Sequence, residues 1–466
     1  MSQSEKPFLT TVNQNIRSQA LAVRNLAQLF FALFILSSTN DKLAIPVVGI
    51  KNPITLYKVL FILLLVLYAV DTASHPIVKS ALFDRGLYRV LVASIIFQTI
   101  ASLLGGWITF GEISLGPEIY GLIQISTFLF IPMVARRYNI SPQSVLKLFL
   151  GAILLHYLFI ASQFLAPQAY ASFVQFLYSP LRGDNALGWN DHDLSFIGLQ
   201  RTANYGTFTA AFGLLILAFT SKSPLGKLLA LSVGSLSIFF WLFSYSRAVF
   251  LMMMVALLVI GMRAKIVFKG STNLGILVIP LTLAGALLAI AFDTSLVRWI
   301  EDVPSLYAFV APEKGGIEGK LQIAESAPYM FYQSPIVGWG HRNFADIQTT
   351  AGIPVLSPAT HSYALTILLS CGIIGGVVYV AMFIGIVRAL WRCKRRDYVI
   401  VCAMFIGLGL YNVVYDAGSL DVFACFNGIA AYYALRSKSR MATVRVGRRF
   451  KRLNTELLKH VYTVSA

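Results

Sequence analysis

Residues 338–344, Gly-Trp-Gly-His-Arg-Asn-Phe, and residues 360–363, Thr-His-Ser-Tyr, close the longest polar interruption in this chain. The interruption separates an apolar run that ends near Phe292 from another that begins after His361. Most of the remaining sequence is apolar enough to form helices inside a bilayer. We therefore expect residues 293–361 to form a large loop that lies on a membrane scaffold and carries the chemistry.

The composition is that of an integral membrane protein. Hydrophobic residues make up 57% of the 466 positions and charged residues 12%, whereas soluble domains carry about 25% charged residues. The expected fold is an all-α polytopic membrane protein, because apolar runs long enough to cross a bilayer recur along the chain. They predict twelve transmembrane helices, at about residues 21–38, 55–73, 88–110, 118–135, 143–165, 203–220, 226–243, 247–263, 273–292, 362–387, 398–415 and 421–435.

Charge alternates between successive connections of these helices. The predicted inner turns carry Lys79, Arg85, Arg89, Arg136, Arg137, Lys147, Lys222, Lys227, Arg263, Lys265, Lys269, Arg388, Arg392, Lys394, Arg395 and Arg396. The outer connections before residue 293 carry Glu112, Glu118, Asp184, Asp191 and Asp193. Because basic loops stay in the cytoplasm, both termini are expected inside and the loop 293–361 outside. The net charge of +18 then indicates contact with anionic lipid rather than nucleic acid.

This topology divides the chain into five parts. They are a cytoplasmic N-terminus (1–20), a nine-helix membrane region (21–292), a periplasmic catalytic loop (293–361), three C-terminal transmembrane helices (362–435) and a basic cytoplasmic tail (436–466). The expected location is a bacterial inner membrane, crossed many times, with no cleavable signal peptide. All four cysteines fall in membrane segments or beside an inner turn, so no disulfide framework is expected.

Charged residues at the outer ends of helices are the main candidates for chemistry. Arg201 precedes one predicted helix, and Arg247 begins another after Ser246. A guanidinium beside free N–H groups at a helix start suits an anion, particularly a phosphate. The alternative is an arginine that snorkels to the membrane interface. His361 stands where the loop re-enters the membrane and is a candidate general base, although a histidine at a helix start can also be purely structural.

Other polar motifs in the outer connections carry weaker signals. His341 and Arg342 are secondary candidates, and His156 and His192 are weaker again. The run 191–193, Asp-His-Asp, suggests a metal site only weakly, because adjacent loop residues seldom all reach one ion. We therefore predict no metal and no cofactor. The glycine-rich run at 315–319 lacks the Lys-Ser/Thr pair of a phosphate loop.

Four segments, in this order, resemble the bacterial O-antigen ligase and polymerase superfamily with its Wzy-type C-terminal region. Residues 201–208, Arg-Thr-Ala-Asn-Tyr-Gly-Thr-Phe, resemble the Arg and Gly-x-Phe entry to a central helix, and residues 246–248 resemble a Ser-Arg-small element. Residues 320–344 resemble a stretch that opens with Gly-Arg and ends in Gly-x-Gly-x-x-Asn-Phe. Residues 361–375 resemble a His-Asn helix start followed by a Gly-hydrophobic-hydrophobic-Gly end.

This resemblance implies a GT-C-like membrane glycosyltransferase without a metal. Its donor would be a glycan on undecaprenyl pyrophosphate, and its acceptor hydroxyl would belong to lipid A-core or a growing glycan at the periplasmic face. Arg247 and Lys320, with Arg201, would hold the pyrophosphate, and His361 would be the base. Lys320 stands where the family usually has Arg, which keeps the charge but loses the bidentate fork. Ser362 replaces the usual Asn, and Ser370 replaces an acidic residue.

Several functions remain open at this level. Ligase and polymerase differ only in the acceptor, and we favour the ligase because its His and Arg pattern is the one matched. An exopolysaccharide polymerase and a protein O-glycosyltransferase are related alternatives. The alternative from another class is a transporter or flippase, which would show half-chain repeats and helices broken at the midplane. A non-catalytic assembly protein would leave the charged candidates scattered.

Overall fold

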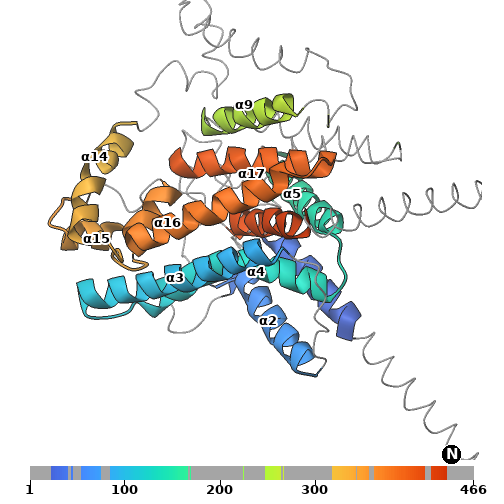
Figure 1. Cartoon of the computed structure of the whole chain (residues 1–466), viewed down its shortest axis with the longest axis horizontal. Coiled ribbons are helices and arrows are strands. Elements are labelled where there is room, and N and C mark those ends of the chain that lie inside the picture. Colours follow the sequence, from blue (N-terminus) through green and yellow to red (C-terminus); the bar gives the residue numbers. More distant parts are fainter. Residues whose placement is uncertain are drawn as a thin grey trace, which may run out of the picture.

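The computed structural model describes residues 23–39, 44–45, 54–74, 84–165, 168, 224, 247–263, 266, 317–342, 344–355, 362–414 and 421–437. Its helices are 23–37, α2 (Leu56–Ser74), α3 (Arg85–Phe110), α4 (Leu115–Arg137), α5 (Pro142–Leu165), α9 (Arg247–Met262), α14 (Ile317–Gln333), α15 (Phe344–Thr350), α16 (Tyr363–Trp391), α17 (Arg396–Val414) and 421–437. Strands β1 (Ala44–Ile45) and β2 (Ile54–Thr55) pair antiparallel. The described part of the chain is therefore helical apart from this short pair (Figure 1).

Nine of the twelve predicted spans fall on described residues, and each of these nine contains a helix. The other three, at 203–220, 226–243 and 273–292, lie outside the described residues. Within the described ranges, four helices are long and apolar enough to cross a membrane: Leu56–Ala73, Arg85–Phe110, Leu115–Arg137 and Tyr363–Trp391. The prediction of a helical membrane protein is thus confirmed.

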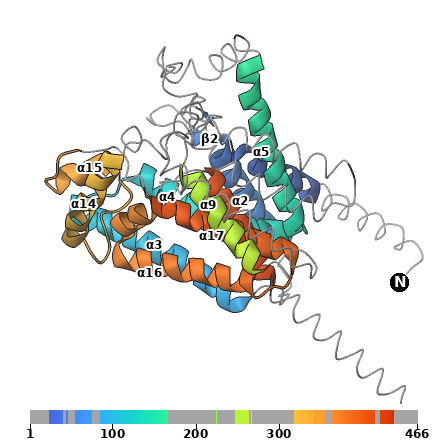
Figure 2. The ribbon, with the colours of Figure 1, turned by 90° about the horizontal axis from the view of Figure 1, so that it is seen from above.

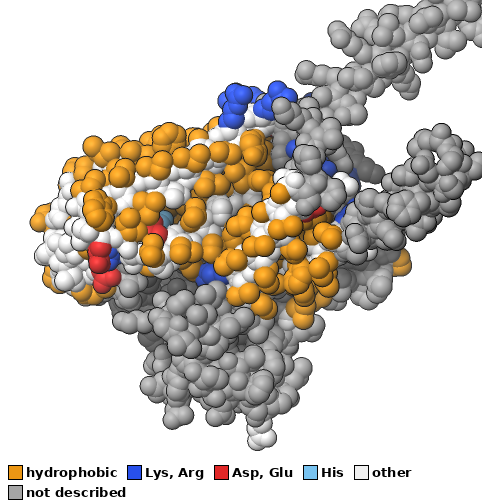
Figure 3. Space-filling model, turned by 90° about the horizontal axis from the view of Figure 1, so that it is seen from below, with side chains coloured by type: hydrophobic (Ala, Val, Ile, Leu, Met, Phe, Trp, Pro, Cys, Tyr) orange, Lys and Arg blue, Asp and Glu red, His pale blue; other side chains and the backbone are white. Residues whose placement is uncertain are grey.

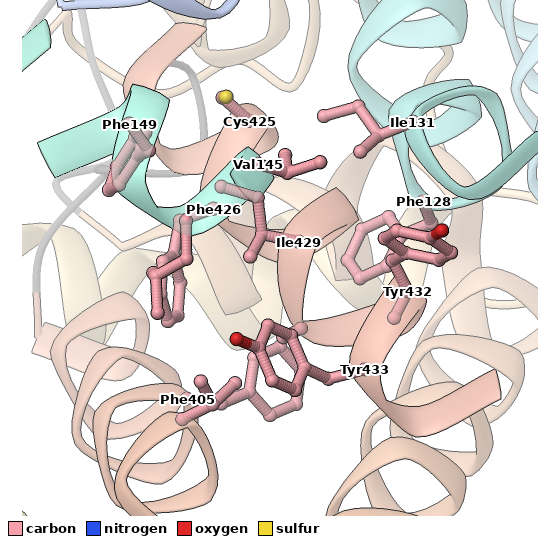
Figure 4. Close-up of a cluster of buried hydrophobic side chains, with 14 of the residues drawn as sticks. Phe128, Ile131, Val145, Phe149, Phe405, Cys425, Phe426, Ile429, Tyr432 and Tyr433 are labelled. Carbon is pink, nitrogen blue, oxygen red and sulfur yellow. The ribbon is translucent and has the colours of Figure 1, made fainter. Parts of the chain in front are cut away.

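The helix at 421–437 forms the centre of the bundle. Nearly every residue of it is buried, as expected for a helix that is apolar on all sides. Figure 4 shows Phe426, Ile429 and Tyr433 of this helix among side chains of the surrounding helices, including Phe128 of α4 and Phe149 of α5. Dense packing of these side chains fixes the positions of the surrounding helices relative to the central one.

Helices α3 and α16 lie side by side along one flank of the bundle (Figures 1 and 2). The start of α3 is fixed by Asp84, whose carboxylate accepts from the N–H groups of Gly86 and Leu87, and such caps contribute about 1 kcal/mol.

Many outward side chains of these helices are apolar, such as Phe97, Trp107 and Val377. Figure 3 shows hydrophobic side chains over most of the described surface on one face. This surface suits contact with lipid tails.

Basic residues gather at one end of the bundle. Arg137 at the end of α4 forms an ion pair with Asp71 of α2 at 2.6 Å, and Arg395 pairs with Asp397 at the start of α17 at 2.9 Å. The Arg263 guanidinium donates to the carbonyl of Trp391, the last residue of α16. We call this the basic end. The opposite end, where α3 and α4 meet the segment 334–342, is called the loop end.

Helix α14 covers the loop end and contains the run 321–332, whose mildly amphipathic pattern predicts a helix along the membrane interface. Its buried residues Ile323, Ala327 and Met330 follow helical spacing and face inward, whereas Tyr329 and Tyr332 are exposed. Exposed tyrosines beside an apolar bundle are typical of the interface between lipid and water. Helix α15 follows after the 334–342 segment and was not predicted. The run 305–310 is also mildly amphipathic and predicts a second helix along the interface, and it lies outside the described residues.

Candidate active site at the loop end

Helix α16 is broken at Gly372, within its run from Tyr363 to Trp391. Gly372 has φ 61° and ψ −160°, a conformation that is essentially limited to glycine. A break of this kind releases backbone carbonyl and N–H groups from helical hydrogen bonds. The Cys371-Gly372-Ile373-Ile374-Gly375 pattern, which the sequence resemblance places at a helix end, therefore marks an interruption from which the helix continues.

The segment 335–340 fills this break and takes up the released backbone groups. Four backbone hydrogen bonds join the two segments: Trp339 N to Leu369 O at 2.7 Å, Gly340 N to Ser370 O at 2.9 Å, Ile373 N to Pro335 O at 2.8 Å and Ile374 N to Ile336 O at 3.3 Å. Buried backbone groups need such partners. The loop is therefore built into the helix rather than laid upon it.

Two glycines let the segment 338–342 approach the helices closely. Gly338 and Gly340 have φ of 74° and 78°, values that favour glycine. A Cβ on Gly338 would lie 2.4 Å from Leu369 O, and one on Gly340 would lie 2.8 Å from the Cα of Gly106 in α3. The Gly-x-Gly spacing of this motif is thus required by packing against α16 on one side and α3 on the other.

Trp339 anchors the segment from within. Its side chain is buried, and its indole N–H donates to the carbonyl of Met330 in α14 at 2.9 Å. It packs with Ile323, Phe344 and Leu369 in a small core of its own. Buried tryptophan combines a large apolar area with one hydrogen bond that must be satisfied. This residue joins α14, α15 and α16 into one unit.

Glu118 of α4 holds the next part of the segment. Although it lies near a helix start, it is 7% exposed. The Ser102 hydroxyl of α3 donates to both of its carboxylate oxygens, at 2.8 and 2.7 Å. The backbone N–H of His341 donates to Glu118 Oε1 at 2.8 Å and to Ser102 Oγ at 3.0 Å. We call Ser102, Glu118 and His341 the Glu118 cluster.

The His341 imidazole lies against the α4 backbone at Gly121. A Cβ added at Gly121 would lie 2.5 Å from His341 Nε2, so the ring occupies space that any other residue would fill. Burial lowers the pKa of His341, and the nearby Glu118 carboxylate acts in the opposite direction. Because burial is the larger of the two effects, the imidazole is biased toward its neutral form.

Arg342 follows at the rim of the same site. Its guanidinium pairs with Glu112 at 3.0 Å, donates to the Glu112 carbonyl, and lies 4.4 Å from the centre of the Phe110 ring. The Glu112 side chain is 72% exposed, whereas the Arg342 side chain is 12% exposed. The carboxylate is therefore open to water, while the guanidinium packs against Phe110. A cation therefore directly follows the half-buried His341 in the segment.

The predicted site residues fall into three groups in the structure. His341 and Arg342, the secondary candidates and neighbours in the sequence, both lie at the loop end. Arg247 is the first residue of α9 and Lys320 lies in the first turn of α14, but their side chains are not among those described. Arg201 and His361 lie outside the described residues.

His361 is not among the described residues, but the residue that follows it, Ser362, begins the described start of α16. Ser362 is the N-cap of the helix, and its hydroxyl accepts from the N–H of Leu365 at 3.3 Å. Serine and asparagine are comparable at this position. The replacement of the usual Asn by Ser362 therefore keeps a capped helix start directly after His361.

Ser102 and Glu118 are the residues that sequence reasoning missed. The available signal was an acidic residue at the start of an apolar helix, which was counted only as an outer charge. Within the described ranges, no three His, Cys, Asp or Glu side chains are close enough to hold a metal ion. The described polar groups at the loop end include the Glu118 carboxylate, the His341 imidazole and the Arg342 guanidinium. Such groups are suited to proton transfer and anion binding.

A helical bundle with an apolar flank and a polar site at one end is typical of a polytopic membrane protein whose site lies at a membrane surface. Residues 229–380 match the family model described as O-antigen ligase. This match supports the resemblance to the O-antigen ligase and polymerase superfamily over this part of the chain. No curated protein matches the chain significantly.

Proposed function

We propose that this protein transfers a glycan from a lipid diphosphate carrier, undecaprenyl pyrophosphate, to an acceptor hydroxyl at the outer face of the membrane. The observation that carries the proposal is the family match over residues 229–380. The matched stretch contains Arg247, Lys320, the 338–342 segment and His361. It therefore includes the candidate base and two of the three candidate cations, together with the loop that is built into α16.

The proposed roles follow from the charge that the reaction develops. As the bond between the sugar and the diphosphate breaks, negative charge grows on the departing phosphate, and fixed cations stabilise it. Arg247 and Lys320, with Arg201, take this role. His361 accepts the proton of the acceptor hydroxyl as that oxygen bonds to the anomeric carbon. Attack from the side opposite the leaving group inverts the anomeric configuration.

The acceptor is proposed to be lipid A-core, which makes the protein an O-antigen ligase. A polymerase, which would use a second carrier-linked glycan as acceptor, needs the same donor-side groups. Transport is disfavoured by the way the break in α16 is filled. In transporters, broken helices line a substrate cavity at the midplane, whereas here the released groups at Gly372 bond to residues 335–340.

Deleting the gene in its host and separating the surface polysaccharide on a gel tests this proposal. A ligase deletion leaves lipid A-core without attached polysaccharide, while polysaccharide that is still linked to its lipid carrier accumulates. A polymerase deletion gives core that carries a single repeat unit. Unchanged surface polysaccharide of every length would refute both functions.

A further inference from the structure

A buried carboxylate at the loop end has no role in the transfer step described above. Glu118 is 7% exposed, and removing a charged group from water costs several kcal/mol. The nearest described cation of the segment, Arg342, pairs with Glu112 instead. The hydrogen bonds of Glu118 run to Ser102 and to the backbone of His341, so its charge is directed at the 340–342 turn.

The geometry of the turn shows what this charge controls. The hydrogen bonds from His341 and Ser102 fix the His341 backbone between α3 and α4. Gly121 lies one helical turn after Glu118 on the same face of α4, and it leaves room there for the imidazole. The backbone and the ring of His341 are therefore held by successive turns of one helix.

We propose that Glu118 is a positioning residue: with Ser102 it holds the 340–342 turn so that the His341 imidazole and the Arg342 guanidinium meet the diphosphate of the donor. The proposal rests on the function proposed above for its substrate, and the arrangement itself rests on the structure. An imidazole and a guanidinium on successive residues are suited to phosphate oxygens, because both donate hydrogen bonds and one of them can gain a proton.

Two groups contact His341 directly, Glu118 on α4 and the Ser102 hydroxyl on α3. The thiol of Cys371 on α16 lies beside Ser102, and Arg342 forms its own ion pair with Glu112. Glu118 is the charged group that acts on the imidazole, and it favours the protonated form. An arriving diphosphate adds negative charge and shifts the imidazole in the same direction.

The first test moves the imidazole and leaves the carboxylate in place. Gly121→Ala puts a methyl group where His341 Nε2 lies, whereas Gly116→Ala on the same helix meets nothing within 4 Å. With purified protein and carrier-linked glycan, we expect Gly121→Ala to lower kcat/KM for the donor by about 10²-fold, a typical effect of a 1 Å displacement. Gly116→Ala should match the wild type. Equal kinetics of the two variants would overturn the proposal.

A double variant distinguishes displacement of the imidazole from unfolding of the protein. Combining Gly121→Ala with His341→Ala removes both the clash and the ring. We expect this double variant to have the Tm of His341→Ala alone and the same low kcat/KM. Wild-type kcat/KM in the double variant would show that the imidazole has no part in transfer and would overturn the proposal.

The second test measures the effect of the Glu118 charge on the protonation of His341 and does not require glycan transfer. The chain has six histidines, so NMR titration of labelled imidazoles identifies His341 as the signal missing in His341→Gln. Glu118→Gln removes the charge that raises the His341 pKa, so the imidazole should protonate at lower pH than in the wild type. An unmoved titration would contradict the proposal. Inactive wild-type protein together with a shifted titration would refute the transfer function and leave the cluster supported.

Discussion

The backbone N–H of Trp339 donates to the carbonyl of Leu369 across 2.7 Å, which joins the polar loop to the broken membrane helix. In an unbroken helix the Leu369 carbonyl would accept from the N–H of Ile373, but Gly372 turns the chain away. Loop and helix therefore complete each other's hydrogen bonding. A substitution in the loop segment or at the helix break should therefore destabilise both.

Gly372→Ala should destabilise the protein severely. The φ of 61° suits glycine alone, and a Cβ would lie 2.3 Å from Ile336 O. The conformation alone costs about 1–3 kcal/mol for a residue with a side chain, and the clash adds to this. Thermal unfolding in detergent measures the loss. Gly151→Ala, which meets nothing within 4 Å, is the matched control and should gain about 0.5–1 kcal/mol; equal Tm values for both variants would contradict the assignment.

Trp339→Ala should cost about 3–5 kcal/mol, the range for emptying a buried aromatic site. Trp339→Phe keeps most of the volume but leaves the Met330 carbonyl without its donor, so we expect a loss of about 1–3 kcal/mol. Chemical unfolding followed by circular dichroism gives both values. A Phe variant as unstable as the Ala variant would show that the hydrogen bond, and not the ring volume, holds the segment.

Glu112→Gln should leave stability nearly unchanged. The carboxylate that pairs with Arg342 is 72% exposed, and ion pairs in such surroundings contribute about 0–1 kcal/mol. Comparing unfolding free energies of the wild type and Glu112→Gln at low and high salt checks this. A loss well above 1 kcal/mol that persists in high salt would mean that the pair is buried in the membrane-embedded protein.

His361→Ala is expected to abolish transfer and to leave donor binding intact, because a base contributes to the rate and not to the grip on the diphosphate. Single-turnover transfer and equilibrium binding of carrier-linked glycan, measured on the same preparation, separate these effects. Full activity in this variant would remove His361 as the base.

Lys320→Arg should retain activity and Lys320→Ala should lose it. Arginine keeps the positive charge and adds a second donor directed at phosphate, whereas alanine leaves the leaving group without that charge. The donor KM and kcat of the two variants decide the matter. Equal activity in both would exclude contact between Lys320 and the diphosphate.

Sequence patterns predicted much of this molecule. Apolar runs place helices because a backbone in lipid must satisfy its own hydrogen bonds, and nine described spans contain helices accordingly. The polar interruption drew attention to residues 338–344, and the order of motifs indicated the superfamily. Arg201 and His361 stay predictions, since they lie outside the described residues.

The contacts of Glu118 were decided by tertiary structure alone. Its bond to His341 joins residues 223 positions apart, and no local periodicity encodes such a pairing. The same holds for Gly121, where the absence of a side chain has meaning only because an imidazole fills the space. Helix formation depends on near neighbours and can be recognised in a sequence, whereas a site made of separate helices exists only once packing has brought them together.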